Sequence, residues 1–262
     1  MRFLFRLLII RLPRIGAGGP PKGFSLTMLT FGQPHRHVPR CESTNDLARD
    51  WARDPDGPAP SGAVVSTDFQ TRGRGQRGRL WEAGPGENAL QSFVYRLPAG
   101  SNPGQIGLVA AVALADALTT LGLAPAIKWP NDILLGGRKT AGILVEVSGP
   151  VAILGIGINV NQTEFDSAAA FVTPPTSLKA ETGRELAVDD VREALCRALT
   201  IWVERWQQEG FLPVLKAARA RLAVGAAVRR GDETAPLTGL EDDGAARVRL
   251  PSGTFARWDT LH

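Results

Sequence analysis

The segment 103–121 limits the possible folds of this chain more than any other stretch. Pro103 stands where a helix would begin, and the residues from there to Leu121 are nearly all apolar. A helix that is apolar all round has to be buried, so other elements must surround it. With 262 residues and 44% hydrophobic content, the chain has enough material to do so in one large domain, or in one large and one small domain. Global disorder is excluded.

The remaining hydrophobic patterns predict a mixture of strands and helices. A helix begins at Ser43 or Thr44, because either side chain can cap it. Strands are expected at 62–67, 89–97, 126–129, 140–147 and 151–160, helices at 188–207 and onward to about 222, and short alternating strands at 227–230, 236–240, 245–250 and 254–258. This order predicts a β-meander beside helices in residues 41–222, followed by a small β-barrel-like domain in residues 223–262.

The amino-terminal residues 1–40 are expected to lie outside the fold. Their apolar run is only Leu7–Ile10, which is too short for a signal peptide or a membrane span. We therefore interpret the segment as a disordered leader or a mis-assigned start. A chain that begins at Met28 is expected to keep full activity.

The few cysteines and histidines exclude several kinds of site. Cys41 and Cys196 stand far apart without metal-ligand spacing, and His35, His37 and His262 are the chain's three histidines. A disulfide framework, a zinc site and a serine–histidine–aspartate triad are therefore not expected, and a reducing, cytoplasmic location is the simpler interpretation. The net charge of +4 suits anionic ligands and equally fits an ordinary soluble surface.

Glycines alternate with arginines in QTRGRGQRGRLW, residues 70–81, which we call the Gly-Arg loop. Glycine lets the backbone approach a ligand, and the guanidinium group suits phosphate and carboxylate. The loop also contains G-x-G-x-x-G, but no apolar helix follows and no acidic residue lies between Glu87 and Asp116, which disfavours a dinucleotide fold. RNA binding and a functionless basic turn stay open as alternatives.

Two further motifs supply cations and a close backbone. KWPND at 128–132 and RKTAGILVE at 138–146 place a lysine at two strand ends, and a glycine lies inside the second strand. GIGIN at 155–159 is a glycine-interrupted apolar strand that ends in an amide. Taken singly, the lysines fit exposed surface charges, and GIGIN fits a tight packing seam as well as the wall of a nucleotide pocket.

Together, Ser43-Thr44-Asn45, the Gly-Arg loop, KWPND, RKTAGILVE and GIGIN resemble the biotin–protein ligase family in order and spacing. The resemblance runs from about Glu42 to the end. It implies an α/β (α+β) fold, in which a mixed-sheet biotin/lipoate ligase-like catalytic domain precedes a small carboxy-terminal SH3-like β-barrel. It also implies the single-function form, because the residues before Ser43, rich in proline and glycine, do not suit a helix-turn-helix domain.

The resemblance also implies roles for particular residues. Biotin would be bound by Ser43, Thr44, Asn45, Gln70, Gly73, Arg74, Lys139 and Gly142. ATP and the adenylate would be bound by Arg77, Arg79, Trp81, Lys128, Asn131, Asp132 and Asn159. Lys139, Arg77 and Arg79 would be the catalytic cations. Gln76 departs from the family, which commonly has arginine there, so Arg74 or Arg77 would take over its phosphate contact.

The implied reaction activates biotin with ATP to biotinyl-5′-adenylate, with Mg²⁺ as the expected metal. The biotinyl group then passes to a lysine of a biotin carboxyl-carrier protein domain, such as that of acetyl-CoA carboxylase. The Gly-Arg loop and the residues up to Asn88 would close over the intermediate as a lid. The alternatives are a lipoate–protein ligase of the same fold and, in a different class, a nucleic-acid-binding regulator. No specific DNA binding and no membrane association are expected, and a homodimer is compatible with the sequence.

Overall fold

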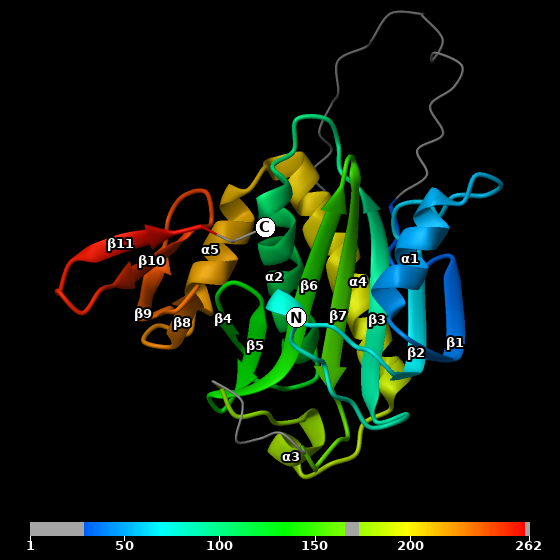
Figure 1. Cartoon of the computed structure of the whole chain (residues 1–262), viewed down its shortest axis with the longest axis horizontal. Helices are drawn as coiled ribbons and strands as arrows, with labels where there is room; N and C mark the ends of the chain where they lie inside the picture. Colours follow the sequence, from blue (N-terminus) through cyan, green and yellow to red (C-terminus); the bar gives the residue numbers. More distant parts are fainter. Residues whose placement is uncertain (1–28, 166–172, 260–262) are drawn as a thin grey trace, which may run out of the picture.

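The computed structural model describes residues 29–165 and 173–259, in which a large sheet and a small sheet are joined by helices (Figure 1). The large sheet has the strand order β1-β2-β3-β7-β6-β5-β4. Its strands are β1 (His35–Cys41), β2 (Val64–Gln70), β3 (Asn88–Arg96), β4 (Ala126–Lys128), β5 (Asp132–Leu135), β6 (Arg138–Ser148) and β7 (Val151–Asn159). β1 pairs parallel with β2, and the other neighbours pair antiparallel. The expected mixed sheet is therefore confirmed.

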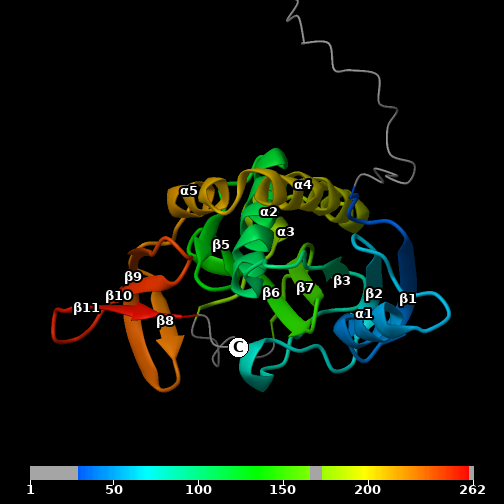
Figure 2. The ribbon, with the colours of Figure 1, turned by 90° about the horizontal axis from the view of Figure 1, so that it is seen from above.

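The apolar segment forms the central helix of the core. A short 3-10 turn, η2 (Pro103–Gln105), leads into α2 (Ile106–Thr120). α2 packs against α4 (Val188–Glu209) and α5 (Leu212–Ala220), and these helices cover one face of the sheet (Figure 2). The segment Pro103–Thr120 has the length and apolarity of a membrane-crossing helix, but most of it is buried inside the protein. Its single charge, Asp116, accepts a hydrogen bond from Trp202 Nε1 at 2.6 Å and pairs with Arg221.

The opposite face of the sheet carries α1 (Thr44–Arg53) (Figure 2). Ala48 and Trp51 are buried against Val94 and Ile153 in a small second core. Ser43 occupies the N-cap position with an extended backbone, as expected, but its side chain makes no capping hydrogen bond. The first turn of α1 therefore has polar side chains available for other contacts.

The structure differs from the sequence expectation for residues 29–40, which belong to the fold. Phe31 is buried, with its ring 5.7 Å from that of Phe93 and 6.1 Å from that of Tyr95. β1 follows and pairs with β2 from His35↔Val64 to Cys41↔Gln70. β1 is an edge strand whose side chains are mostly exposed, so it lacks the apolar alternation by which strands are predicted. The part of the predicted leader before residue 29 lies outside the described residues.

KWPND lies at a hairpin that the sequence only partly revealed. The strand expected at 126–129 ends at Lys128, and β5 begins at Asp132 after a turn through Trp129 and Pro130. β5 was missed because it has only four residues. Gly136 and Gly137 then turn the chain into β6 with φ values of 55° and 78°, which favour glycine. A short helix, α3 (Leu178–Thr182), was also missed.

The carboxy-terminal residues form a second, antiparallel sheet with the order β11-β10-β9-β8. Its strands are β8 (Ala227–Arg230), β9 (Glu233–Leu240), β10 (Ala246–Arg249) and β11 (Phe255–Trp258). This small β-domain was expected. Trp129 Nε1 donates a hydrogen bond to the carbonyl of Gly244 at 3.0 Å, and Arg219 donates to the carbonyl of Leu240. The small sheet is therefore tied to the chain next to KWPND.

Candidate active site

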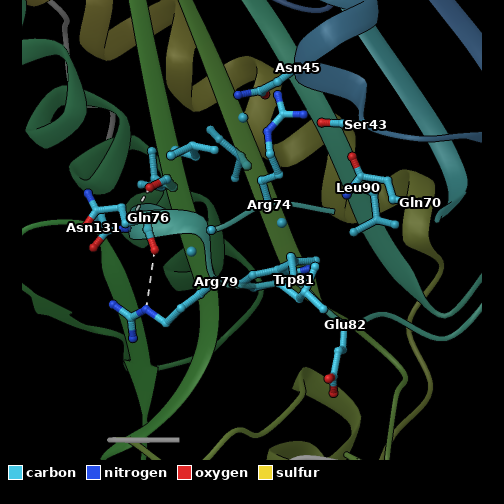
Figure 3. A pocket seen from close by; sticks show the side chains of 18 of the residues that line it. Ser43, Asn45, Gln70, Arg74, Gln76, Arg79, Trp81, Glu82, Leu90 and Asn131 are labelled. Atoms are coloured by element: carbon cyan, nitrogen blue, oxygen red, sulfur yellow. Dashed lines mark hydrogen bonds between the residues drawn. The ribbon is translucent and has the colours of Figure 1, made fainter. Parts of the chain in front are cut away.

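A pocket opens on the face of the large sheet that carries α1, with β3, β6 and β7 as its floor (Figure 3). The floor contains Gly142, Gly155 and Gly157, where other side chains press on the backbone. A Cβ atom on Gly155 would lie 2.2 Å from Asn45 Oδ1, and one on Gly157 would lie 2.6 Å from the Trp81 indole. The glycines of RKTAGILVE and GIGIN are therefore required by close packing.

The Gly-Arg loop folds back on itself along the pocket wall. Gly75 donates its backbone N–H to Arg79 O at 2.7 Å, and Trp81 donates to Gly73 O at 2.9 Å, on either side of the 3-10 turn η1 (Gln76–Gly78). A Cβ on Gly73 would lie 2.6 Å from the carbonyl oxygen of Trp81. Glycine at position 73 therefore lets the two arms of the loop approach each other.

Trp81 lies inside the pocket, across the glycines of β6 and β7. Its ring is also near Lys139, whose Nζ is 5.5 Å from the ring centroid. Its Nε1 is buried without a hydrogen-bond partner in the part of the chain that the structure describes. A ligand acceptor at this position would satisfy that N–H group.

Hydroxyl and amide groups gather at the α1 end of the pocket. The backbone N–H of Thr44 donates to Gln70 Oε1 at 2.8 Å, and its hydroxyl donates to the same oxygen at 3.1 Å. Because Oε1 accepts both hydrogen bonds from Thr44, Gln70 Nε2 points toward Gly73. A Cβ atom added to Gly73 would lie 2.9 Å from this Nε2. Ser92 Oγ lies 2.7 Å from Thr44 Oγ1 and donates to Asn45 Oδ1 at 2.5 Å. Thr44, Asn45 and Gln70 are therefore held in fixed orientations.

Lysines and carboxylates gather at the other end. Lys139 Nζ pairs with Asp132 Oδ1 at 2.6 Å. Lys128 is buried and donates to Thr173 Oγ1 at 2.5 Å. Burial lowers the pKa of Lys128, and the nearby Asp132 opposes that shift. The backbone N–H of Lys139 donates to Pro174 O and its carbonyl accepts from Thr176 N, both at 2.8 Å, so the segment 174–176 fixes the start of β6.

The two asparagines have different roles in the structure. Asn131 donates Nδ2 to Ile143 O at 2.8 Å, which attaches the KWPND turn to β6. Asn159 is 4% exposed and donates Nδ2 to Thr176 O at 3.0 Å. Its Oδ1 is buried and has no partner within the described residues. Asn159 therefore offers an acceptor to a ligand in the pocket, whereas the amide nitrogen of Asn131 serves the fold.

The pocket brings together most of the residues singled out from the sequence. Those lining it are Ser43, Thr44, Asn45, Gln70, Arg74, Arg79, Trp81, Asn131, Asp132, Lys139, Gly142 and Asn159. Gly73 is buried within the Gly-Arg loop, and Lys128 lines an adjoining cavity that also contains Arg79, Asp132 and Lys139. Gln76 borders both cavities. The side chain of Arg77 lies outside what the structure describes.

Sequence reasoning missed Glu82 and Gln91, which line the pocket, and three further polar residues that support its α1 end. Ser92 joins Thr44 to Asn45, while Asp46 and Glu146 bind arginines that reach the α1 end. Ser92 gave a weak signal as a hydroxyl inside an otherwise apolar strand. Asp46 and Glu146 looked like ordinary charges on a helix and near a strand end.

A glycine-floored pocket with amide groups at one end and cations at the other gives this α/β protein a site suited to a small anionic ligand. The chain is similar to proteins of one family. The model of the Biotin/lipoate A/B protein ligase family matches residues 38–162. A biotin–[acetyl-CoA-carboxylase] ligase of Paracoccus denitrificans is 37% identical over 231 residues, which cover 82% of this chain and 93% of that protein.

Further relatives agree. A bifunctional ligase/repressor of Bacillus subtilis is 30% identical, over 88% of this chain and 74% of that protein. The solved structure of a biotin protein ligase from Aquifex aeolicus in complex with biotin and ATP superposes with a TM-score of 0.75 at 24% identity, covering 87% of this chain and 96% of that one. The structural likeness establishes the shared fold. The chain belongs to the biotin/lipoate A/B protein ligase family, within its biotin–protein ligase branch.

Proposed function

We propose that this protein activates biotin with ATP to biotinyl-5′-adenylate and transfers the biotinyl group to a lysine of a biotin carboxyl-carrier protein. One observation carries the proposal: the amide-rich end and the cationic end belong to a single pocket with a glycine floor between them. A ligand with a hydrogen-bonding ring at one end and a carboxylate at the other fits this polarity. The names of the relatives supply biotin as that ligand.

Biotin's ureido ring would lie at the α1 end. Gln70 presents Nε2 as a donor there because its oxygen is occupied by Thr44. Ser43 and the backbone of Gly73 and Arg74 complete this end. Fixed donors and acceptors favour a ligand whose polar edge matches them, because an unmatched buried polar group costs binding free energy.

The carboxylate of biotin would lie near Lys139. In the first step a carboxylate oxygen attacks the α-phosphorus of ATP, the bond to the β-phosphate breaks, and pyrophosphate leaves. The ammonium group of Lys139 and the guanidinium group of Arg79 would stabilise the negative charge that builds on the phosphates. In the second step the amine of the carrier lysine attacks the biotinyl carbonyl carbon, and AMP leaves. We infer that Arg77 and Lys128 contribute to the same positive field.

The nucleotide would take the remaining polar positions. Asn159 Oδ1 is a buried acceptor without a partner among the described residues, which suits the exocyclic amine of adenine. Trp81 offers a ring face and an indole N–H that has no partner in residues 29–165 and 173–259. Asn131 and Asp132 would border the nucleotide, Asn131 through the turn that it holds in place.

We infer that Mg²⁺ accompanies ATP. The described residues contain no group of three metal-ligating side chains, so a dedicated metal cage is not part of the proposal. Mg²⁺ is commonly bound by substrate phosphates and one or two carboxylates, and Asp132 and Glu82 line the pocket. When bound, the ion would neutralise phosphate charge. We also place the reaction in the cytoplasm, which agrees with the unpaired Cys41 and Cys196.

The direct test is incubation with ATP, Mg²⁺, biotin and a biotin-carrier domain, followed by mass analysis of the carrier. We expect a mass increase of one biotinyl group, dependent on ATP. A parallel reaction with lipoate tests the sister activity of the family. A carrier that gains mass with lipoate and not with biotin would overturn the proposal.

A further inference from the structure

Four charged side chains form a network at the α1 end of the pocket. Arg74 of the Gly-Arg loop donates both terminal nitrogens to Asp46, at 2.6 and 2.7 Å. Arg49 pairs with Asp46 at 2.8 Å and with Glu146 of β6 at 2.5 Å, and Arg74 lies 3.6 Å from Glu146. The network therefore joins the loop, α1 and β6.

The network also contacts a pocket residue directly. Asn45 donates Nδ2 to Glu146 Oε2 at 3.0 Å and accepts from Ser92 through Oδ1. Both the nitrogen and the oxygen of the Asn45 amide are therefore hydrogen-bonded, which fixes the orientation of this side chain. In Figure 3, Arg74 extends toward Asn45 and Ser43, whereas Arg79 extends away from them, on the side of Gln76 and Asn131. The side chain of Arg74 is therefore directed at α1, away from the cationic end.

We propose that Asp46, supported by Glu146, is a positioning residue that holds the Gly-Arg loop closed over the α1 end of the pocket. Asp46 acts through Arg74: the bidentate ion pair fixes residue 74, and so fixes the backbone of Gly73 and Arg74 beside Gln70. This inference rests on the function proposed above. It gives the network a role in the affinity for biotin, whereas other groups carry out the chemical step.

The geometry of the network distinguishes it from a surface ion pair. The side chains of Arg74, Arg49, Asp46 and Glu146 are 28–36% exposed, and each has two charged partners. A bidentate arginine–carboxylate pair in a network holds its geometry better than an isolated exposed pair. The same loop supplies a contrast, because Arg72 pairs with Glu42 at 3.3 Å through side chains that are 75% and 66% exposed. Glu42→Gln is therefore a matched control on the same loop.

The charge state of Asp46 supports a loop that stays closed at neutral pH. The hydrogen bond from Arg74 holds the pKa of Asp46 below its usual value, against the effect of desolvation. A carboxylate with a depressed folded-state pKa contributes stability above its unfolded pKa, and this contribution is lost as the pH falls through the folded pKa. The groups facing Asp46 are Arg49, Arg74, the thiol of Cys41, whose pKa is raised mainly by burial, and, through Arg49, Glu146. Because the pKa of Asp46 is depressed, loop closure is not expected to change with pH near neutrality.

Limited trypsin digestion tests loop closure without any substrate. The bond after Arg79 lies in the Gly-Arg loop, and its cleavage is followed by mass spectrometry in the full-length protein. We expect Asp46→Asn to be cut about 10-fold faster than wild type, with Glu42→Gln unchanged, because opening of the loop limits cleavage. Equal rates for Asp46→Asn and wild type would overturn the proposal.

Calorimetric titration with biotin in the absence of ATP tests the affinity. We expect the Kd for biotin to rise about 10-fold in Asp46→Asn and in Arg74→Gln, with no further rise in the double variant, because both remove one interaction. Asp46→Glu should recover part of the loss. For Asp46→Asn at saturating biotin, kcat for adenylate formation should stay within about 2-fold of wild type, because Asp46 does not touch the groups of the chemical step.

The outcomes separate this inference from the proposed function. If wild type does not bind biotin, the proposed function fails, while the trypsin result still reports on the network. If wild type binds biotin and the two single variants bind it as tightly as wild type does, or if their losses add in the double variant, the positioning role of Asp46 is refuted. Melting temperatures within a few degrees of wild type exclude unfolding as the cause of a loss, and Arg74→Gln tests the pair without altering α1.

Discussion

At the scale of single residues, the site depends on residues whose positions are fixed by the groups around them. Lys139 is held by its backbone to the segment 174–176 and by its ammonium group to Asp132. Gly157 lies under the Trp81 ring with no room for a methyl group. Two substitutions test these roles separately, one for charge and one for shape.

Lys139→Ala should impair adenylate formation far more than folding. If its charge acts mainly in the transition state, the loss is expected to be on the order of a hundred- to a thousand-fold in rate, as for one preorganised donor in other enzymes. Pyrophosphate release at saturating biotin and ATP measures this, with the melting temperature checked in parallel. Lys179→Ala, which removes a lysine paired with the exposed Glu185, is the control. A near wild-type rate in a folded Lys139→Ala protein would remove Lys139 from the chemical step.

Gly157→Ala should displace Trp81 while leaving the fold intact. Its Cβ would lie 2.6 to 2.9 Å from three atoms of the indole, so the ring has to move out of the pocket. We expect a red shift of tryptophan fluorescence and a fall in kcat/KM on the order of 100-fold, typical of a misplaced site. Gly107→Ala is the matched control, because its Cβ would meet only Val145, at 3.7 Å. An unchanged emission spectrum in Gly157→Ala would show that the ring adapts in place.

At the scale of elements, the segment before α1 completes the sheet and its core. Phe31 fills the space beside Phe93 and Tyr95, and β1 covers the edge of β2. Phe31→Ala should lower the free energy of unfolding by about 3–5 kcal/mol, the usual cost of removing a buried phenylalanine ring. Urea denaturation measures it.

A truncation pair checks the same element from the chain end. A protein that begins at Met28 is predicted to keep full activity, whereas one that begins at Glu42 should lose soluble, folded protein because β2 loses its partner strand. A folded, active protein from Glu42 would show that β1 is dispensable. Loss of folding from Met28 would instead assign a structural role to the preceding residues.

At the scale of the whole molecule, the small β-domain is attached beside the site. Trp129 is 4% exposed, and its indole N–H reaches Gly244 across the junction. Trp129→Phe keeps most of the ring but leaves the Gly244 carbonyl unpaired, so we expect a loss of about 1–3 kcal/mol in the free energy of unfolding. Phe255→Ser, at a 65% exposed position of the same domain, should change it by less than about 0.5 kcal/mol. If Trp129→Phe has the same free energy of unfolding as Phe255→Ser, the hydrogen bond from Trp129 to Gly244 contributes nothing to stability.

The sequence by itself determined the elements with strong periodicity and the chemistry of the motifs. The apolar run at 103–121 became α2, the apolar segments at 89–97, 140–147 and 151–160 became β3, β6 and β7, and most of the motif residues line one pocket. These features are local, because burial on one face is encoded in the spacing of apolar side chains. The small β-domain followed from the same kind of pattern, with turns marked by glycine.

Only the tertiary structure decided which residues became partners. β1 is exposed at a sheet edge, so no periodicity marks it, and its place depends on pairing with β2. The contacts of Ser92 with Asn45 and of Glu146 with Arg49 join residues about 50 and 100 positions apart. Polar contacts between distant segments leave no pattern in a single sequence, because the physical requirement is that each buried polar group finds a partner, and the folded chain alone determines which one it is.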